Sequence, residues 1–353
     1  MKLINQEKLL LSYIQQSKFF TSSIMTKLTN SRWLILGGSG FVGRWLTLFG
    51  QEISVRSDSP SMVTIASRDP QRTRIRLRSF LPSQYLVPKV ISIHDLLHNP
   101  ETLMDLNGVD TIFHAATPTD RQDQSILELP SLTAAILDMC QGFDLPKFIH
   151  LSSGGVYPRE RFFGQLIPEG ANRVSVSQSV NAYQQVKVTL EQLVESATES
   201  GKVRGANPRL FAFAGPGFPI DSTFAFSDFM RSALLQKPIE IRGNPDTCRS
   251  YMHPVNMVEW LISLSARIDQ VGLDPVHIGS HIPISMMDLA TRISQDFGGI
   301  EVRYSEKGKQ DAEWYVPEVL RMRSLGCDLE LSTLDEILDS WKVYLAPQHS
   351  AWS

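Results

Sequence analysis

The sequence predicts an α/β protein in which a Rossmann-type, doubly wound parallel sheet is followed by a smaller C-terminal cap. Two observations lead to this prediction. Short apolar, β-branched runs alternate with helical stretches along the first 214 residues, which is typical of βαβ units in a sheet covered on both faces. A glycine cluster directly follows the first apolar run, as in folds that bind a ligand at a strand-to-helix turn.

Five buried strands are expected before residue 152, because each is a short apolar run without alternating polar positions. They lie at 33–36, 62–66, 89–93, 111–115 and 147–151, with helices at 41–49 and 127–139. The carboxyl ends of parallel strands meet at one edge of a sheet, so the segments after the strands should line one crevice. Those segments are the glycine loop, Ser67-Arg68, 114–118 and 152–155.

From about Gly215 the chain becomes richer in turn-forming residues. Helices are expected at 224–235, 255–267 and 285–297, and a short strand at 237–242. We therefore divide the chain into three parts. They are an N-terminal extension (residues 1–30), a dinucleotide-binding Rossmann domain (31–214) and a mainly substrate-binding cap (215–345), some of whose strands return to the Rossmann core.

Residues 1–24 mix charged residues with leucines, which predicts an amphipathic helix ahead of the Rossmann domain. An alternative is that Met25 is the natural start, because 25–33 is the short leader that a domain beginning at Trp33 needs. The stretch lacks the apolar core and cleavage site of a secretory signal. No run approaches the ~20 apolar residues of a membrane-spanning helix, so we expect a cytoplasmic protein without a membrane partner.

Composition argues against several classes of function. The formal charge is −3 and no long Lys/Arg run is present, so a nucleic-acid partner is not expected. Cys140, Cys248 and Cys327 are far apart and odd in number. Neither a metal site nor a disulfide framework is therefore expected, and a reducing compartment is indicated.

The glycine cluster fits two spacings at once. Gly38, Gly40 and Gly43 satisfy G-x-G-x-x-G, while Gly37, Gly40 and Gly43 satisfy G-x-x-G-x-x-G. In both cases glycine permits a tight turn and close approach of the backbone to phosphate, and the next helix supplies free N–H groups and a favourable dipole. The loop alone does not distinguish a phosphate cradle from a bend between buried segments.

Ser67, Arg68 and Asp69 follow the second expected strand, where an acidic residue would bind the adenosine ribose hydroxyls. A hydroxyl and a guanidinium instead suit a 2′-phosphate, so NADPH is favoured over NADH, and Asp69 keeps NAD open. The stretch 68–78 contains five arginines. It is either a solvated face or a local anion site.

Tyr183 and Lys187 are spaced i, i+4, which places a phenol and an ammonium on one face of a helix. The ammonium favours the phenolate form, so Tyr183 can exchange a proton with a substrate hydroxyl or carbonyl. Ser153, at the carboxyl end of the fifth expected strand, can donate a hydrogen bond to the same substrate oxygen. By itself, Tyr-x-x-x-Lys is more often a surface helix with an extended lysine.

With these residues in this order, the chain resembles the extended short-chain dehydrogenase/reductases, specifically the NAD(P)-dependent nucleotide-sugar epimerase, dehydratase and reductase group. The resemblance covers about residues 32–345. It rests on the glycine loop 37–43, His114-Ala-Ala116, the segment 148–157, Tyr183-x-x-x-Lys187, Arg209-Leu-Phe with Gly215-Pro216, and Arg249-Ser-Tyr-Met-His253.

The resemblance implies that Tyr183 is the acid/base, that Lys187 favours its phenolate and binds the nicotinamide ribose, and that Ser153 is the catalytic serine. Ser153, Gly154 and Arg249 would contact the substrate, Arg249 at its diphosphate. With Ser67 and Arg68 added from the residues themselves, the expected cofactor contacts are Gly37, Gly40, Phe41, Val42, Gly43, Ser67, Arg68, Ala115, Ala116, Thr117, Tyr183 and Lys187. Family members commonly pair through two long helices, here 127–139 and 182–198, so a homodimer is expected.

Departures from the family pattern narrow the expected reaction. Gly154-Gly155 stand where the dehydratases carry an Asp-Glu pair, so 4,6-dehydration is not expected. The helix 127–139 lacks the asparagine that the family often has there, which puts part of the usual proton relay in doubt. The run after Arg209 is Leu-Phe-Ala-Phe-Ala, so one common substrate contact is absent.

These observations favour NADPH-dependent reduction of a nucleotide-linked 4-keto-6-deoxy sugar. One alternative is a nucleotide-sugar 4-epimerase with bound NAD, which uses the same serine, tyrosine and lysine. Another is a non-sugar carbonyl reductase of the same family. A cofactor-binding regulator without catalysis is a hypothesis of a different class, and the presence of Ser153, Tyr183 and Lys187 speaks against it.

Overall fold

The computed structural model describes residues 2–57, 63–117, 124–158, 162–304, 311–327 and 331–349. Within these ranges it contains the expected central sheet, with six parallel strands. Their order is β3 (Lys89–Ser92), β2 (Val63–Ser67), β1 (Trp33–Leu36), β4 (Thr111–His114), β5 (Lys147–His150) and β7 (Arg204–Ala206). This is the strand order of a doubly wound dinucleotide-binding sheet, and the predicted Rossmann-type fold is confirmed.

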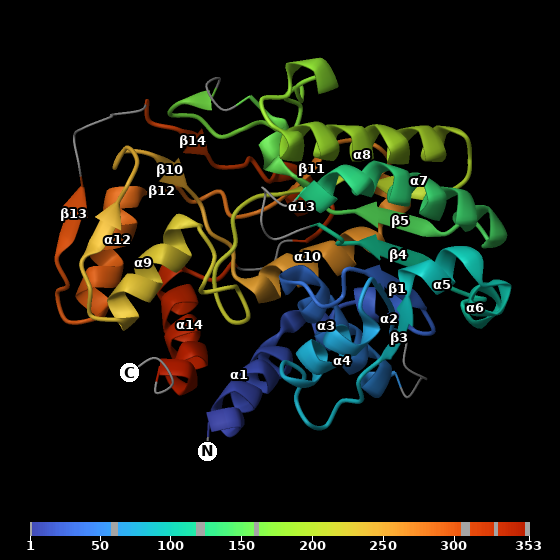
Figure 1. Ribbon diagram of the computed structural model, residues 1–353, viewed down its shortest axis with the longest axis horizontal. Helices are drawn as coiled ribbons and strands as arrows, with labels where there is room; N and C mark the ends of the chain where they lie inside the picture. The colour runs from blue at the N-terminus through green and yellow to red at the C-terminus, as the bar shows by residue number, and fades with distance from the viewer. Residues whose placement is uncertain are drawn as a thin grey trace.

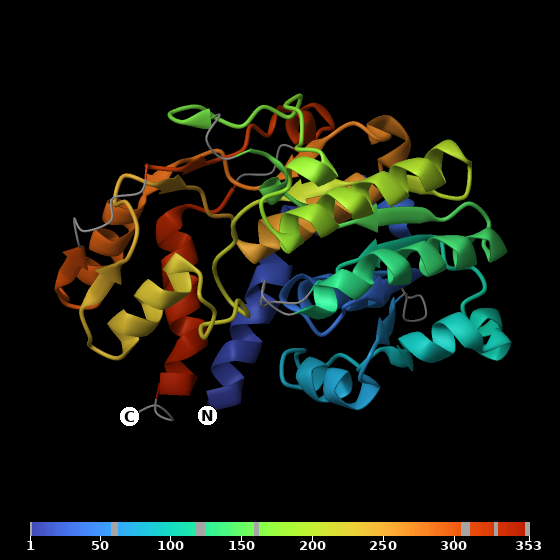
Figure 2. The ribbon, with the colours of Figure 1, turned by 45° about the horizontal axis from the view of Figure 1, so that its top comes forward.

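Successive side chains of each strand face opposite sides of the sheet, so two helical layers are needed to cover it. Trp33 and Ile35 lie in one core and Leu34 and Leu36 in another. The first core is covered by α3 (Phe41–Arg56), α4 (Pro70–Arg78) and α10 (Pro254–Ser265), and the second by α5 (Ile93–His98), α7 (Leu129–Met139) and α8 (Ala182–Glu199). The layers are visible in Figures 1 and 2.

Smaller sheets continue from the carboxyl edge of the central one. β6 (Ser152–Ser153), β8 (Pro208–Leu210) and β11 (Val276–Ile278) form a parallel sheet that holds the turn after β5. Short helices fill the connections, namely α6 (Pro100–Asp105), α11 (Ile268–Val271) and α13 (Leu320–Ser324).

A separate core lies in the C-terminal half of the chain. Around it are α9 (Ala225–Leu234), α12 (Met286–Asp296), α14 (Leu334–His349), the strand pair β9 (Ile239–Ile241) and β13 (Val302–Tyr304), and the sheet of β10 (Cys248–Arg249), β12 (Ile284–Ser285) and β14 (Trp314–Tyr315). Figure 1 shows these elements gathered on one side of the central sheet. The domain boundaries at residues 30 and 214 stay a prediction.

The N-terminal residues form the expected helix, α1 (Lys2–Gln16), followed by a short turn and α2 (Ile24–Leu28). In Figures 1 and 2, α1 lies beside α14. Leu10, Ile14 and Phe19 are buried in the core that contains β1 and α3, so this segment is packed into the molecule. No helix of the described residues is long and apolar enough to cross a membrane.

Candidate active site

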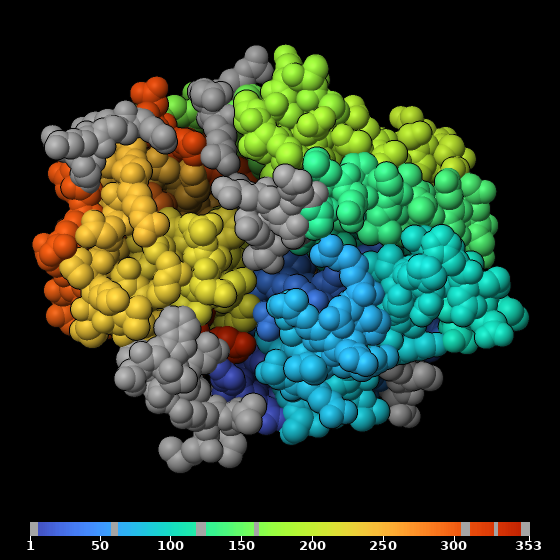
Figure 3. Space-filling view, in the orientation of Figure 1, coloured from blue at the N-terminus to red at the C-terminus, as the bar shows by residue number. Residues whose placement is uncertain are grey.

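Two adjoining cavities lie at the carboxyl ends of the central strands, where ligands bind in sheets of this type. Their volumes are about 460 Å³ and 290 Å³, and both are lined by Gly40, Ala115 and Thr117. Figure 3 shows a recess in this region, between the blue atoms of the first βαβ unit and the yellow atoms of the segment that leads into α9. The crevice expected from the strand ends is therefore present.

The glycine loop is shaped to receive a phosphate at the junction of the two cavities. Gly37 has φ +82°, and a Cβ there would lie 2.8 Å from the carbonyl carbon of Ala115, so only glycine fits the turn. Gly40 is the N-cap of α3, and no side chain caps that helix end, which leaves its first N–H groups available to an anion. The loop thus fits the pyrophosphate of a dinucleotide. Gly43 lines neither cavity.

The smaller cavity is lined by more basic than acidic side chains. Ser67, Arg68, Arg72 and Arg76 line it together with Asp69 and Glu128. The Asp69 carboxylate accepts a hydrogen bond from Arg72 N at 2.9 Å and so caps α4, a role that competes with binding a ribose. Three guanidinium groups around one cavity favour the anion-site interpretation of this stretch.

Tyr183 and Lys187 lie one turn apart on α8, as predicted, and both line the larger cavity. Lys187 is buried, and its Nζ donates to Leu151 O at 2.7 Å and to Thr117 Oγ1 at 3.0 Å. Nζ also lies 6.0 Å from the centre of the Tyr183 ring. The surface-helix interpretation is therefore excluded for Lys187, whose ammonium is fixed between the ends of two strands and the tyrosine.

Ser153 lies on the same side of this cavity as Tyr183. Its Oγ accepts a hydrogen bond from Gly155 N at 3.0 Å, which leaves its O–H free to donate. A Cβ at Gly155 would lie 3.2 Å from Ser153 Oγ and 3.5 Å from Tyr183 Cε1. The two hydroxyl-bearing side chains therefore flank a common point, where a substrate oxygen would receive hydrogen bonds from both.

The electrostatics of the site are set by burial. Burial lowers the pKa of Lys187 to about 7, with the negative charge of Glu191 opposing that shift. Behind Lys187, His114 Nδ1 and His150 Nδ1 are 3.2 Å apart. Burial lowers the pKa of His114 to about 3 and that of His150 well below its ordinary value, so this wall is neutral and holds no second cation at neutral pH.

Gly154 is closed off from the cavity, contrary to the expectation that it contacts the substrate. A Cβ at this position would lie 2.6 Å from Phe211 Cζ and 2.7 Å from Tyr315 Oη. The two rings fill the space that a side chain would need, so an acid cannot be placed there without moving them. The packing therefore excludes an acid at the first position of the pair.

Arg249 lines the larger cavity and also a third one of about 340 Å³. Its Nη2 donates to Glu313 Oε2 at 2.5 Å, and its guanidinium carbon lies 5.5 Å from the centre of the Tyr315 ring. Arg249 is thus at the junction of two spaces, where a diphosphate that joins two larger groups could be held.

Most residues that line the larger cavity belong to no motif in the sequence. Many of these residues are aromatic, and five of them come from one segment: Phe211, Phe213, Phe218, Phe224, Phe226, Tyr251 and Tyr315. The signal that was available is the density of phenylalanine between residues 211 and 226. In the sequence, Arg72 and Arg76 stand out only as members of the basic stretch 68–78.

Sequence comparison identifies relatives of the chain. The "NAD dependent epimerase/dehydratase family" matches residues 33–279. "UDP-glucuronic acid decarboxylase 4" of Arabidopsis thaliana is 22% identical over 307 residues, which cover 83% of this chain and 64% of that protein. "dTDP-D-glucose 4,6-dehydratase" of Dictyostelium discoideum is 23% identical over 274 residues, or 74% of this chain and 61% of that protein. The chain thus spans less than two thirds of these relatives.

Solved structures share the fold. UDP-glucuronic acid 4-epimerase from Bacillus cereus, in complex with UDP-glucuronic acid and NAD, superposes with a TM-score of 0.73 at 17% identity, covering 90% of this chain and 99% of that one. Epimerase Mth375 from Methanothermobacter thermautotrophicus gives a TM-score of 0.74 at 20% identity, covering 94% and 97%.

Proposed function

The chain belongs to the NAD-dependent epimerase/dehydratase family, and from that premise we propose that it catalyses the NADPH-dependent reduction of a nucleotide-linked 4-keto-6-deoxy sugar. One observation carries the proposal. The cavity that contains Ser153, Tyr183 and Lys187 adjoins a second cavity lined by three arginines, where a 2′-phosphate would be recognised.

In this reaction the bound dinucleotide supplies the hydride. Tyr183 delivers a proton to the carbonyl oxygen, and the Ser153 hydroxyl donates a hydrogen bond to that oxygen and so stabilises the charge that develops there. The Lys187 ammonium, held by Leu151 O and Thr117 Oγ1, favours the phenolate that remains. The site lacks a side chain at Gly154, so elimination of water has no acid to assist it.

The aromatic walls support a deoxygenated sugar. Among the described residues, many that line the cavity around Ser153, Tyr183 and Lys187 are phenylalanines and tyrosines. Burying a methyl group against such rings stabilises the bound state by roughly 0.8 kcal/mol. Burying a hydroxyl that has no hydrogen-bond partner destabilises it. Arg249 would hold the diphosphate at the other end of the cavity.

A nucleotide-sugar 4-epimerase with NAD is the second candidate. It uses the same three catalytic side chains, and the structurally similar epimerase from Bacillus cereus was solved with NAD. The two functions differ in cofactor use, because a reductase consumes and releases its dinucleotide whereas an epimerase regenerates it in place.

The test is a fluorescence titration of the protein with NADPH and with NADH, followed by an assay with thymidine diphospho-4-keto-6-deoxyglucose. We expect tighter binding of NADPH and its oxidation by the keto sugar. A protein that is purified with bound NAD, interconverts nucleotide hexoses and leaves NADPH untouched would contradict the proposal and support the epimerase.

We further propose that the protein acts in the cytoplasm as a homodimer paired through α7 and α8. These helices pack against each other on one face of the sheet. Gel filtration with light scattering would test this, and a monomer at micromolar concentration would contradict it.

A further inference from the structure

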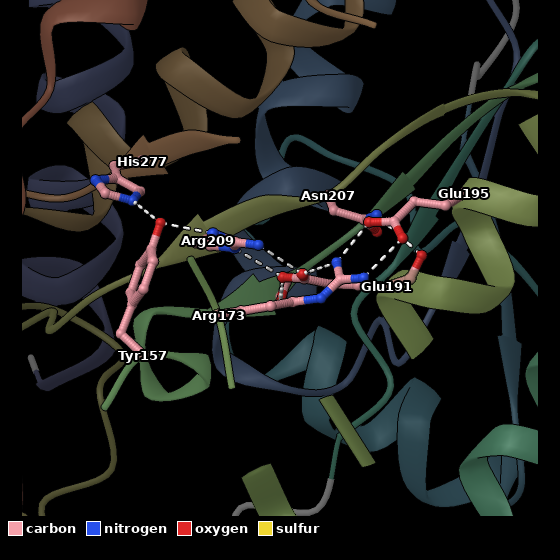
Figure 4. Close-up of polar contacts among 8 residues, drawn as sticks. Tyr157, Arg173, Glu191, Glu195, Asn207, Arg209 and His277 are labelled. Atoms are coloured by element: carbon pink, nitrogen blue, oxygen red, sulfur yellow. Dashed lines mark hydrogen bonds and ion pairs between the residues drawn. The ribbon is translucent and has the colours of Figure 1, made fainter. Parts of the chain in front are cut away.

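A buried polar network lies beside the catalytic group and takes no part in the proposed chemistry (Figure 4). At its centre is Glu191, whose side chain is inaccessible to solvent. Glu191 Oε1 accepts from Ser152 Oγ at 2.5 Å and from Arg209 Nε at 2.9 Å. Its Oε2 accepts from Arg209 Nη2 at 2.8 Å and from Arg173 Nη1 at 2.6 Å.

The network reaches beyond these residues and fixes the carboxylate. Arg209 Nη1 donates to Tyr157 Oη at 2.6 Å, and Tyr157 Oη lies 2.7 Å from His277 Nε2. Burial opposes ionisation of Glu191, but the hydrogen bonds and charge of Arg209 outweigh it and keep the pKa of Glu191 below its ordinary value. Every acceptor position of a fully buried anion is filled, so its place is sharply defined.

The position of Glu191 in the chain connects it to catalysis. It follows Tyr183 and Lys187 at intervals of four residues, so the three side chains share one face of α8. Ser152 immediately precedes Ser153 in β6. Both serines line the larger cavity, and the hydrogen bond from Ser152 to Glu191 ties the strand to α8 one residue before Ser153.

A second contact joins α8 to the turn that follows Ser153. Gln184, the residue after Tyr183, donates from Nε2 to Gly155 O at 2.8 Å and to Tyr157 O at 3.4 Å. Its Oε1 accepts from Val180 N at 2.9 Å. Gln184 is buried, so these bonds are shielded from competition with water.

We propose that Glu191 and Gln184 are positioning residues, which clamp the turn that carries Ser153 to the helix that carries Tyr183 and Lys187. The clamp has one contact before Ser153, at Ser152, and one after it, at Gly155. Neither residue touches the reacting atoms. Their effect is to keep two hydrogen-bond donors aimed at one substrate oxygen, a geometry in which errors of about 1 Å can cost up to 100-fold in rate.

The test uses Ser152→Ala, which removes the bond to Glu191, and Gln184→Met, which removes the bonds of the Gln184 amide. Neither substitution leaves a buried charge without an ionic partner, because Arg209 and Arg173 still pair with Glu191. We expect kcat for NADPH oxidation by thymidine diphospho-4-keto-6-deoxyglucose to fall about tenfold in each variant. KM for the sugar and the dissociation constant for NADPH should change less than twofold. Hydrogen exchange, followed by mass spectrometry, should become faster in peptides that cover 152–157.

Gln185→Met is the matched control, because it makes the same substitution at the next, solvent-exposed position of α8, and it should behave as the unaltered protein. Unchanged kcat in both Ser152→Ala and Gln184→Met would overturn the proposal, as would a loss of kcat that only follows a loss of NADPH binding. The kcat measurement rests on the proposed function, whereas the hydrogen-exchange measurement does not. If the unaltered protein leaves NADPH unoxidised, that function fails, and unchanged exchange in 152–157 would still overturn the clamp.

Discussion

The ammonium of Lys187 is held more firmly than the sequence alone could indicate. Its two hydrogen bonds, to Leu151 O and Thr117 Oγ1, join α8 to the ends of β5 and β4. Because the side chain is buried, its pKa falls to about 7 although the negative charge of Glu191 opposes the shift, and a bound phosphate or a phenolate nearby would further stabilise the charged form. Lys187 thus fixes α8 against the ends of these two strands and also provides a positive charge in the site.

Replacing Tyr183 with phenylalanine removes the proton donor and keeps the ring. We expect kcat to fall by about 10² to 10⁴, the usual contribution of a positioned acid or base. NADPH binding, measured by fluorescence, should change little because most of the expected cofactor contacts are made by other residues. Unaltered turnover in Tyr183→Phe would favour the hypothesis of a cofactor-binding regulator.

The guanidinium groups of the smaller cavity make a prediction about cofactor choice. Arg72→Gln and Arg76→Gln should each weaken NADPH binding by about tenfold, the order of one charge-assisted hydrogen bond. NADH binding should change little, since it lacks the 2′-phosphate. The control is Arg78→Gln, which alters the same helix outside the cavity, and equal effects on both dinucleotides would contradict the assignment.

One glycine shows what spacing cannot indicate. The expected cofactor contacts include Gly37, Gly40 and Gly43 but not Gly38, for which the spacing predicts no constraint. In the structure a Cβ on Gly38 would lie 2.6 Å from Ile65 Cγ2, so a side chain is excluded there as well. The constraint comes from Ile65 in β2, which the spacing of the glycines does not indicate.

At the scale of elements, α1 has a larger part in the fold than an extension would have. Phe20, just after it, stacks on Phe49 of α3 with ring centres 5.3 Å apart. Tyr13 contacts both Trp45 and His253, with ring centres 6.5 Å and 4.8 Å apart. These contacts cover α3 and α10 on the face of the sheet opposite to α8.

A protein that starts at Met25 should therefore be much less stable. Removing the first 24 residues exposes the apolar surface that Leu10, Ile14 and Phe19 cover, and several buried side chains each contribute roughly 1.5 to 3 kcal/mol. We expect the shortened protein to unfold at a markedly lower urea concentration or to aggregate. The same urea midpoint in both forms would show that the segment is dispensable and would favour Met25 as the start.

At the scale of the whole molecule, one buried carboxylate links the N-terminal segment to the centre of the chain. Glu259 of α10 is buried, and Ser17 Oγ donates a hydrogen bond to it. Burial raises the pKa of Glu259 to about 7, with hydrogen bonds from Ser17 and Asn256 opposing the shift. The folded protein therefore holds this proton more tightly than the unfolded chain does.

The sign of the resulting pH effect follows from linkage. With a pKa raised from 4.5 to about 7, the contribution of Glu259 to stability is present below pH 4.5 and is lost as the pH rises to about 7. Glutamine does not ionise, so the Glu259→Gln variant does not lose stability in this pH range. The free energy of unfolding of the variant, minus that of the unaltered protein, should therefore increase by roughly 1 to 3 kcal/mol between pH 5 and pH 8. Urea unfolding at the two pH values measures it, and a pH-independent difference would contradict the prediction.

Much of the architecture was predictable because it depends on local patterns. The five expected strands are present within one or two residues of their predicted bounds, since buried parallel strands are uninterrupted apolar runs. Helix α4 was not predicted as a helix, because its arginines hide the two buried positions, Thr73 and Leu77. The strand β7 is three residues long and contains Gly205, too little for a pattern to show.

The sequence by itself was enough to predict the sheet and the glycine loop and to single out Ser153, Tyr183 and Lys187 as candidates, because these features show as residue types in local patterns. Only the tertiary structure decided which groups surround them. Phe211 and Tyr315 close the space at Gly154, Arg72 and Arg76 join Arg68, and Glu191 reaches Ser152 across 39 residues of chain. These contacts join segments distant in sequence, and their partners are selected by packing in three dimensions, which no local spacing records.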